Sequence, residues 1–270
     1  MEHNDFTGVE WQPSLRAKVK PSDSQTFWGA VSRSVRTPGG IEGADLLAID
    51  AGSPFTGPDG NLYVPKIVGN PNANAEVLHA FETGYRFHPT PRWQLDAAVF
   101  HNDYRDLINV QGFTRFEPGN PGTAEMAFAN LLDAYSQGGE IALTTAVSDE
   151  LRLTASYSFL HVSVSGPPGL DTANLSRGSP RHQAALRSSF DFTTRATADA
   201  QFRFVDNLFN TRSYLTADLR LAYRPTEWIE FSLVGQNLFG TQHRERGSEP
   251  LLPSTSEVPR GFYGKLSWSF

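Results

Sequence analysis

Apolar and polar side chains alternate along most of this chain with a period of two residues. The pattern is clearest over the last twelve residues, where one face carries Phe262, Gly264, Leu266, Trp268 and Phe270. Because a β-strand points successive side chains to opposite faces, residues 259–270 are predicted to form a strand with one apolar and one mostly polar face. Helical periodicity is almost absent elsewhere, so the pattern predicts an all-β fold.

Ten further segments repeat this alternation, which gives about eleven predicted strands in all. They are residues 15–19, 27–31, 77–87, 93–110, 140–147, 151–159, 183–192, 197–204, 215–223 and 229–236. Short turns at 21–25, 88–91, 148–150, 193–195 and 225–226 alternate with longer loops at 36–75, 111–125, 164–180, 207–212 and 238–258. The chain is therefore predicted to be an antiparallel up-and-down meander with all its long loops at one end.

This asymmetry of turns and loops decides between two kinds of β protein. A soluble sandwich also alternates apolar and polar positions, but it has no reason to gather its long loops at one end. Short periplasmic turns, long extracellular loops and aromatic residues near strand ends are typical of a transmembrane barrel. Trp93, Tyr223 and Trp228 lie near predicted strand ends. We therefore predict a transmembrane β-barrel, with a soluble β protein as the alternative.

Composition narrows the classes of function. The chain has 270 residues and a net charge of −6, and its 23 Lys and Arg residues are scattered, which argues against a nucleic-acid partner. It contains no cysteine, so disulfides, thiolate nucleophiles and Cys-ligated metals are excluded. The N-terminal residues 1–11 have neither a basic nor an apolar segment, so no signal peptide is predicted.

Several stretches together resemble the C-terminal part of a TonB-dependent outer-membrane receptor. The segment TFWGAVSRSVRTP is similar to an aromatic strand followed by Arg-x-Pro, and FETGYR and FHNDYRDL are similar to two strand motifs of that family. His101 replaces the usual Tyr of the second motif. The Gly138-Gly139-Glu140 strand start, the NLF of 237–239 and the closing strand 261–270 complete the resemblance, in order, over nearly the whole chain.

The resemblance implies a barrel of about 22 strands, plugged by an N-terminal domain, in the outer membrane of a Gram-negative bacterium. Residues 1–270 would be its last eleven strands, with the plug and signal peptide absent. The implied function is TonB-dependent uptake of a ferric siderophore, haem, cobalamin or a similar nutrient. The implied partners are the TonB energy-coupling complex through the missing N-terminal part, the outer-membrane assembly machinery, lipid and lipopolysaccharide, and a small-molecule metal chelate as cargo.

Few single residues stand out as functional candidates. Arg33 and Arg36 could line the lumen and hold the plug or an anionic ligand, although a wall charge is the simpler interpretation. Phe262, Leu266, Trp268 and Phe270 resemble the terminal signal that the assembly machinery reads.

Catalytic chemistry is not predicted, and no cofactor is expected. Six of the seven histidines (His79, His88, His101, His161, His182 and His243) lack metal-ligand spacing. The acidic residues Asp103, Asp106 and Glu117 could form a carboxylate pair of the glycosidase type, but a solvated wall explains them better. No nucleophile-elbow or phosphate-loop motif occurs. Two alternatives stay open: a passive porin-like or structural barrel, and an outer-membrane barrel enzyme.

Overall fold

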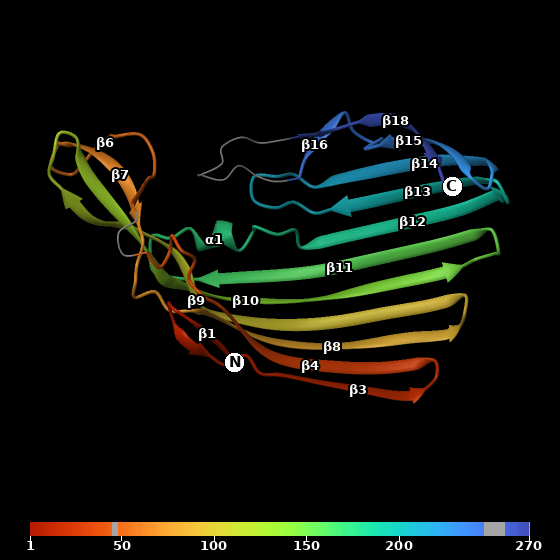
Figure 1. The fold of residues 1–270 in the computed structure, drawn as a ribbon, viewed down its shortest axis with the longest axis horizontal. Coiled ribbons are helices and arrows are strands. Elements are labelled where there is room, and N and C mark those ends of the chain that lie inside the picture. Colours follow the sequence, from red (N-terminus) through yellow and green to blue (C-terminus); the bar gives the residue numbers. More distant parts are fainter. Residues whose placement is uncertain (45–47, 246–256, 270) are drawn as a thin grey trace.

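Eleven antiparallel strands form the main path of one large sheet, which has fourteen strands among the residues that the computed structural model describes, 1–44, 48–245 and 257–269 (Figure 1). Each long strand pairs with the next along the chain. In order they are β3 (Ser14–Ser22), β4 (Gln25–Arg36), β8 (Glu76–Thr90), β9 (Trp93–Glu117), β10 (Gly122–Ala146), β11 (Leu151–Ser165), β12 (His182–Thr193), β13 (Ala196–Val205), β14 (Tyr214–Thr226), β15 (Ile229–Gln236) and β18 (Gly261–Trp268). All eleven predicted strands are confirmed, as is their up-and-down order.

The connections divide the sheet into two ends. Short turns at 23–24, 91–92, 147–150, 194–195 and 227–228 lie at the right in Figure 1, which we call the turn end. The longer connections lie at the opposite end, called the loop end. This separation of turns from loops is the asymmetry predicted from the sequence.

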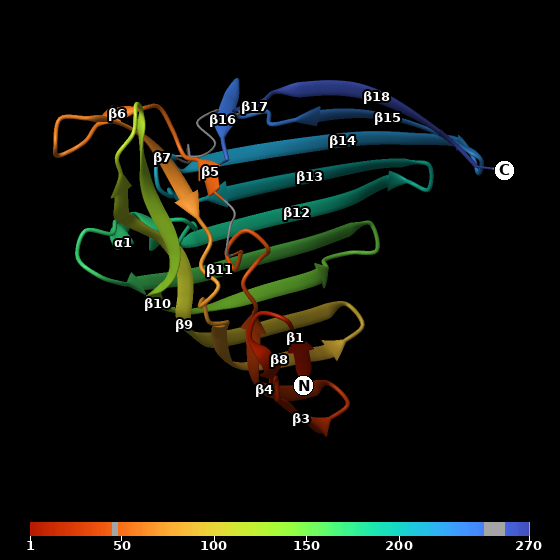
Figure 2. The same cartoon turned by 60° about the vertical axis from the view of Figure 1, so that its left-hand side comes forward.

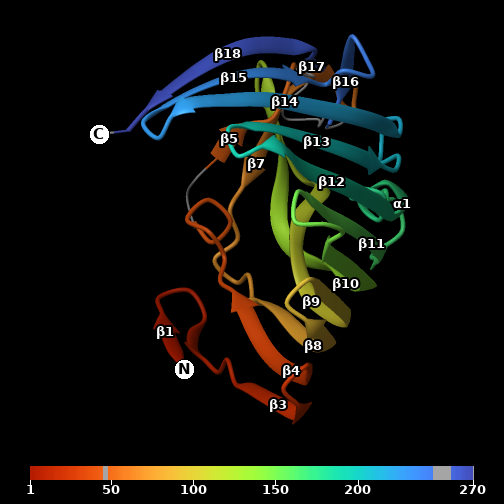
Figure 3. The ribbon, with the colours of Figure 1, turned by 90° about the vertical axis from the view of Figure 1, so that its right-hand side faces the viewer.

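The sheet curves into an arch that does not close. Seen along the strands in Figure 3, it runs from β3 at the bottom to β18 at the top, and these two strands lie far apart. Neither strand has a partner on its outer side among the described residues. The chain therefore forms part of a barrel wall with two free edges.

The two faces of the arch differ in chemistry and in exposure. On neighbouring positions, Leu233 is 68% exposed and Ser232 only 5%, while Leu215 is 51% exposed and Thr216 only 2%. Side chains on the inner side of a curved sheet crowd one another, so the polar face is the concave one. The convex face carries a continuous apolar band, and no large side chain is fully buried among the described residues. The sheet thus turns its apolar side outward, as a membrane wall does.

The predicted loop at 111–125 is wrong. Strands β9 and β10 continue through it, each 25 residues long, and only residues 118–121 connect them. The pairing of these strands has register shifts at four places, including Asn130/Leu132 and Leu132/Ala134. A bulge inserts one residue and moves the following side chains to the other face. The period-two pattern is consequently lost in the sequence although the strand continues.

The predicted loop at 36–75 also contains regular structure. It includes β5 (Ala48–Asp50), β6 (Phe55–Thr56) and β7 (Leu62–Val68). Strand β7 pairs with β10 in parallel, from Tyr63↔Gly122 to Val68↔Ala127. These short strands and residues 112–127 of β9 and β10 form a loop-end lobe that projects beyond the rest of the sheet (Figure 2).

The remaining elements are short. Strands β1 (Glu2–Asn4) and β2 (Gly8–Glu10) form a hairpin before β3, and β16 (Gln242–Arg244) pairs with β17 (Glu257–Pro259) in the last long connection. Helix α1 (Thr172–Leu175) is a single turn after β11. Within the described ranges, none of the helical structure is long and apolar enough to cross a membrane.

Candidate functional site on the concave wall and loop end

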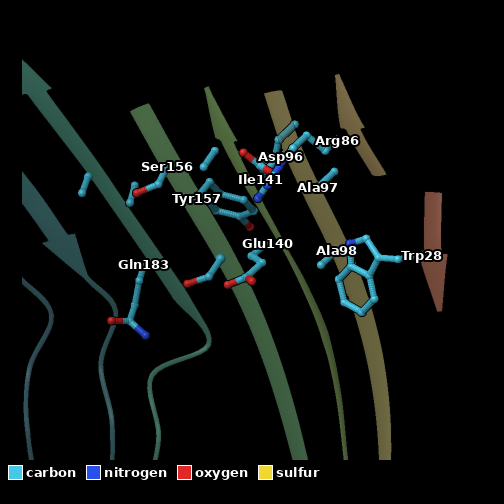
Figure 4. Close-up of a pocket in the computed structure, with 14 residues that line it drawn as sticks. Trp28, Arg86, Asp96, Ala97, Ala98, Glu140, Ile141, Ser156, Tyr157 and Gln183 are labelled. Atoms are coloured by element: carbon cyan, nitrogen blue, oxygen red, sulfur yellow. The ribbon is translucent and has the colours of Figure 1, made fainter. Parts of the chain in front are cut away.

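A shallow cavity of about 460 Å³ lies on the concave wall near its middle strands. Its lining comes from consecutive strands, β4 to β12. Figure 4 shows the indole of Trp28 on one side, Gln183 on the other and Glu140 between them, with the Arg86–Asp96 pair above. Hydroxyls of Ser156 and Ser158 complete the polar lining. The surface offers mixed hydrogen-bonding groups and one aromatic ring, but no concentration of one charge.

Near the turn end of β13, β14 and β15, charges on this wall are balanced between adjacent strands. Arg220 on β14 donates to Asp199 on β13 at 2.8 Å and also pairs with Glu230 on β15. Arg224 donates to the second oxygen of Glu230 at 2.8 Å. These ion pairs cross-link three strands near the turn end and leave the acids compensated.

Arg36 is the centre of an ion-pair cluster at the loop end of the concave face. Its guanidinium donates to Glu76 on β8 at 2.7 Å and to Glu42 in the following loop at 2.8 Å. Glu76 also accepts a hydrogen bond from the backbone amide of Ile108 at 2.8 Å. Burial raises the pKa of the Glu42 carboxyl, but hydrogen bonds from Arg36 and from the Gly39 amide outweigh it, so the net pKa lies below its usual value. This cluster fastens the start of the long 37–75 connection to β4 and β8.

Arg33 lies on the other face of β4. The register pairs it with His79 and places it with Val31 and Val35, whereas Arg36 is paired with Glu76. Its side chain donates to the Trp11 carbonyl oxygen and lies 3.6 Å from Glu10. The structure therefore does not bring the two predicted arginines together, and Arg33 contacts the N-terminal segment. A ligand-binding role for either stays a prediction.

An aromatic cluster holds the loop-end lobe together. The ring of Tyr63, which is 2% exposed, packs edge-on against Phe116 at 5.1 Å, and Phe55 stacks on Phe113 at 5.0 Å. A Cβ at Gly57 or Gly122 would lie 2.6 or 2.8 Å from the Tyr63 ring, so only glycine fits beside it. The cluster joins the β5–β7 segment to the ends of β9 and β10.

The hydroxyl of Tyr63 adds a polar contact to this cluster. It donates to the Asp59 carboxylate at 2.7 Å, and Asp59 also accepts from the Asn61 amide at 3.0 Å. The hydrogen bond from Tyr63 lowers the pKa of Asp59, and the same contact raises the pKa of Tyr63. Ionised Asp59 thus ties the 57–63 turn to the aromatic cluster.

The predicted acidic cluster is not formed. Asp106 and Glu117 are eleven residues apart on the single strand β9, a separation of roughly 35 Å at about 3.3 Å per residue. Asp103 pairs with His101, and Glu117 pairs with Arg115. The physical reason is the extension of β9 through the predicted loop.

The histidines do not gather either. Nδ1 of His182 and the Tyr157 hydroxyl form a hydrogen bond at 2.7 Å. The His243 ring stacks on the Tyr214 ring, with 4.2 Å between the ring centroids. Within residues 1–44, 48–245 and 257–269, no group of three His, Asp or Glu side chains is placed to hold a metal ion.

The closing strand presents its aromatic and aliphatic side chains outward. Phe262, Leu266 and Trp268 share the convex face of β18, opposite Gly235, Phe231 and Ile229 on β15. Phe270 lies outside the described residues. Recognition of these side chains by the assembly machinery stays a prediction.

Apart from Arg36 itself, the residues of the loop-end lobe and of the Arg36 cluster were not expected from the sequence. Tyr63 and Glu76 lie in or beside the predicted loop 36–75, far in sequence from Phe116 and Arg36, which they contact. Glu42 lies in the same loop, six residues after Arg36. The local signal was the apolar run Leu62-Tyr63-Val64, followed by Ile67 and Val68, and Pro65 between them made this segment hard to recognise as a strand.

Comparison with known proteins identifies what this architecture is similar to. The profile of the family described as "TonB dependent receptor-like, beta-barrel" matches residues 2–238. The metal-pseudopaline receptor CntO of Pseudomonas aeruginosa is 24% identical over 66% of this chain and 25% of its own length. The probable TonB-dependent siderophore receptor PirA of Acinetobacter baumannii is 22% identical over 98% of this chain and 39% of its own length.

Solved structures show the same fold. The crystal structure of the siderophore receptor PirA from Acinetobacter baumannii has a TM-score of 0.77 at 18% identity, covering 98% of this chain and 42% of that one. A ferric enterobactin receptor mutant from Pseudomonas aeruginosa, in complex with enterobactin, also has a TM-score of 0.77 at 18% identity, covering 99% and 42%. The chain thus spans about two fifths of the length of these structures.

Proposed function

Because this chain belongs to the TonB-dependent receptor family, whose barrel profile matches residues 2–238, we propose that it forms part of the wall of a receptor for active uptake. Its place is the outer membrane of a Gram-negative bacterium. Uptake would bring a metal chelate through the lumen that the concave face lines, using energy delivered by the TonB complex.

The observation that carries this proposal is the division of the arch into two faces. The apolar convex band suits lipid, and the concave wall carries a polar cavity and strand-to-strand ion pairs that suit a lumen. The long connections and the loop-end lobe lie at one end, where a receptor meets ligand from outside. Nothing in this arrangement requires catalysis.

The named relatives support the class of cargo. They include a metal-pseudopaline receptor, a probable siderophore receptor and an iron-regulated outer-membrane virulence protein of Vibrio cholerae. We infer a small-molecule metal chelate as cargo. The metal is then substrate rather than a resident cofactor. In this proposal the TonB complex acts through a region outside this chain, and the assembly machinery, lipid and lipopolysaccharide contact the convex face and β18.

The test is a chimeric receptor in which this chain replaces the matching C-terminal segment of Acinetobacter baumannii PirA. Cells with and without TonB are compared for accumulation of radiolabelled iron supplied as a siderophore chelate. We expect accumulation only in cells with TonB. Equal accumulation without TonB would favour the passive porin-like barrel instead.

A matched control separates transport from assembly. A chimera carrying Leu219→Lys on the convex face should reach the outer membrane poorly and give no accumulation. If the parent chimera is found in the outer membrane, binds chelate at the cell surface and yet does not import it, the uptake role of this chain is contradicted while its membrane location stands.

A further inference from the structure

The free edge of β3 carries an uncompensated column of positive charge. Arg16, Lys18 and Lys20 take three consecutive positions on the polar face of this strand, and all three are exposed. Successive positions on one face lie about 6.8 Å apart, so the three charges repel one another. None of them forms an ion pair with any residue that the structure describes.

The strand beside them offers no counter-charge. The register places Arg16 opposite Ala30 and Lys18 opposite Trp28 on β4. The Trp28 indole lies over Gly84 of β8, where a Cβ would be 2.5 Å away, so it is directed away from β3. Strand β4 contains no acidic residue, and the nearest acid in register is Glu82 of β8, which lies beyond Ala30 in the row of Arg16. For Lys18 and Lys20, acidic partners would have to lie beyond the free edge or across the lumen.

Ion pairs elsewhere on the concave face favour a counter-charge on an adjacent strand over one from across the lumen. Arg86 on β8 pairs with Asp96 on β9, and Arg220 on β14 pairs with Asp199 on β13. Each of these pairs joins adjacent strands, where facing side chains lie about 4.5–5.5 Å apart. By the same geometry, acids opposite Arg16, Lys18 and Lys20 belong on a strand added to the β3 edge.

The β18 edge of the same sheet does not offer an antiparallel strand with acidic side chains to β3. Eleven strands that alternate in direction leave β3 and β18 pointing the same way, so joining them would create a parallel seam in an antiparallel wall. The polar face of β18 presents Tyr263, Lys265 and Ser267, which would place lysine beside lysine. Charge and direction both disfavour self-closure and pairing with a second copy of this chain.

We propose that the β3 edge accepts an antiparallel β-strand whose lumen-side positions are acidic and whose outward positions are apolar. Backbone hydrogen bonds would provide the pairing, and the acidic side chains would select the partner and its register. The inference rests on the barrel-wall architecture and is independent of the uptake role. Lysines on an edge strand can also deter pairing altogether, and the experiment separates these two roles.

The test uses the full chain refolded in zwitterionic detergent micelles. The chain has no cysteine, so Val19→Cys on the convex face of β3 gives one site for a fluorescent label. Three eleven-residue peptides share the same apolar residues at alternate positions and carry Glu, Ser or Lys at the others. We expect the Glu peptide to bind about tenfold more tightly than the Ser peptide at low salt, with the difference vanishing near 1 M salt.

The matched variant is Arg16→Gln/Lys18→Gln/Lys20→Gln, which keeps the apolar face of β3 intact. It should bind the Glu and Ser peptides equally, provided circular dichroism shows the same strand content as the parent. If the variant does not fold, the parent chain alone tests the proposal. Its preference for the Glu peptide should weaken as salt rises, and the Lys peptide should bind less tightly than the Ser peptide. Equal binding of all three peptides, or binding of none, would overturn the proposal.

Discussion

Single residues fasten the long connections to the barrel wall. Arg36 joins Glu42 and Glu76, so one guanidinium links the 37–75 connection to the sheet. Tyr63 does the same for the loop-end lobe with a buried ring and a hydroxyl bonded to Asp59. Loops that are tied down in this way keep one shape and can present a ligand surface without being ordered first.

The Asp59–Tyr63 contact predicts acid sensitivity of the lobe. The pKa of Asp59 is lower in the folded protein than its unfolded value of about 3.9, so its stabilising contribution is present above that pH. It is lost as pH falls through the folded pKa. A spin label at Leu62→Cys should therefore show constant mobility from about pH 8 to pH 5 and greater mobility below about pH 4.

Asp59→Asn is the matched variant for this measurement. Asparagine keeps an acceptor for the Tyr63 hydroxyl but does not titrate, so the step in label mobility below about pH 4 should disappear. An identical step in the variant would show that another group controls the lobe.

Strands decide which environment each side chain meets. The same alternation that places Leu219 on the convex face of β14 places Gln201 of β13 on the concave face. Paired strands with one apolar side need lipid or another apolar layer on that side. A charged side chain should therefore destabilise the sheet more on its convex face than on its concave face.

Leu219→Lys and Gln201→Lys test this difference at a similar depth in the wall. A lysine on the lipid face near the bilayer midplane costs about 2–4 kcal/mol, whereas a lumen-facing lysine is hydrated. We expect Leu219→Lys to lower the free energy of unfolding by about that amount in urea titrations of chain inserted into lipid vesicles. Gln201→Lys should stay within about 0.5 kcal/mol of the parent. Equal losses would mean that the convex face does not meet lipid.

The whole molecule is an open arch rather than a closed barrel (Figure 3). Closure would have to join β3 to β18, and the parallel directions of these strands oppose it. The family relationship fits this shape, because the chain spans only 42% of the length of the solved receptor structures. The rest of the wall is expected to come from elements outside residues 1–270.

Paired cysteines distinguish an arch from a closed ring. In micelles, Ala17→Cys/Gly264→Cys should form no disulfide within one chain, because the two strands lie at opposite edges. Leu233→Cys/Gly264→Cys joins register partners on β15 and β18 and should cross-link readily under the same oxidant. Mobility on a non-reducing gel reports both results. An intrachain disulfide in the first variant would contradict the open arch, and a disulfide-linked dimer would contradict the acidic-strand proposal.

The sequence by itself determined the eleven strands, their order, their two faces and the family. Alternation with a period of two depends only on local side-chain direction, so segments such as 215–223 and 261–268 are readable without any knowledge of their neighbours. The same pattern, with its separated turns and loops, also indicated a membrane wall.

The tertiary structure decided what local periodicity cannot encode. Bulges near Met126 and Leu132 shift the alternation and hide the length of β9 and β10. The parallel pairing of β7 with β10, the burial of Tyr63 and the ion pairs of Arg36 join residues tens of positions apart. Such contacts depend on how the chain returns on itself. The odd spacing of Arg33 and Arg36 places them on opposite faces of one strand by alternation alone. Only the tertiary structure shows their partners, which are Glu10 for Arg33 and Glu42 and Glu76 for Arg36.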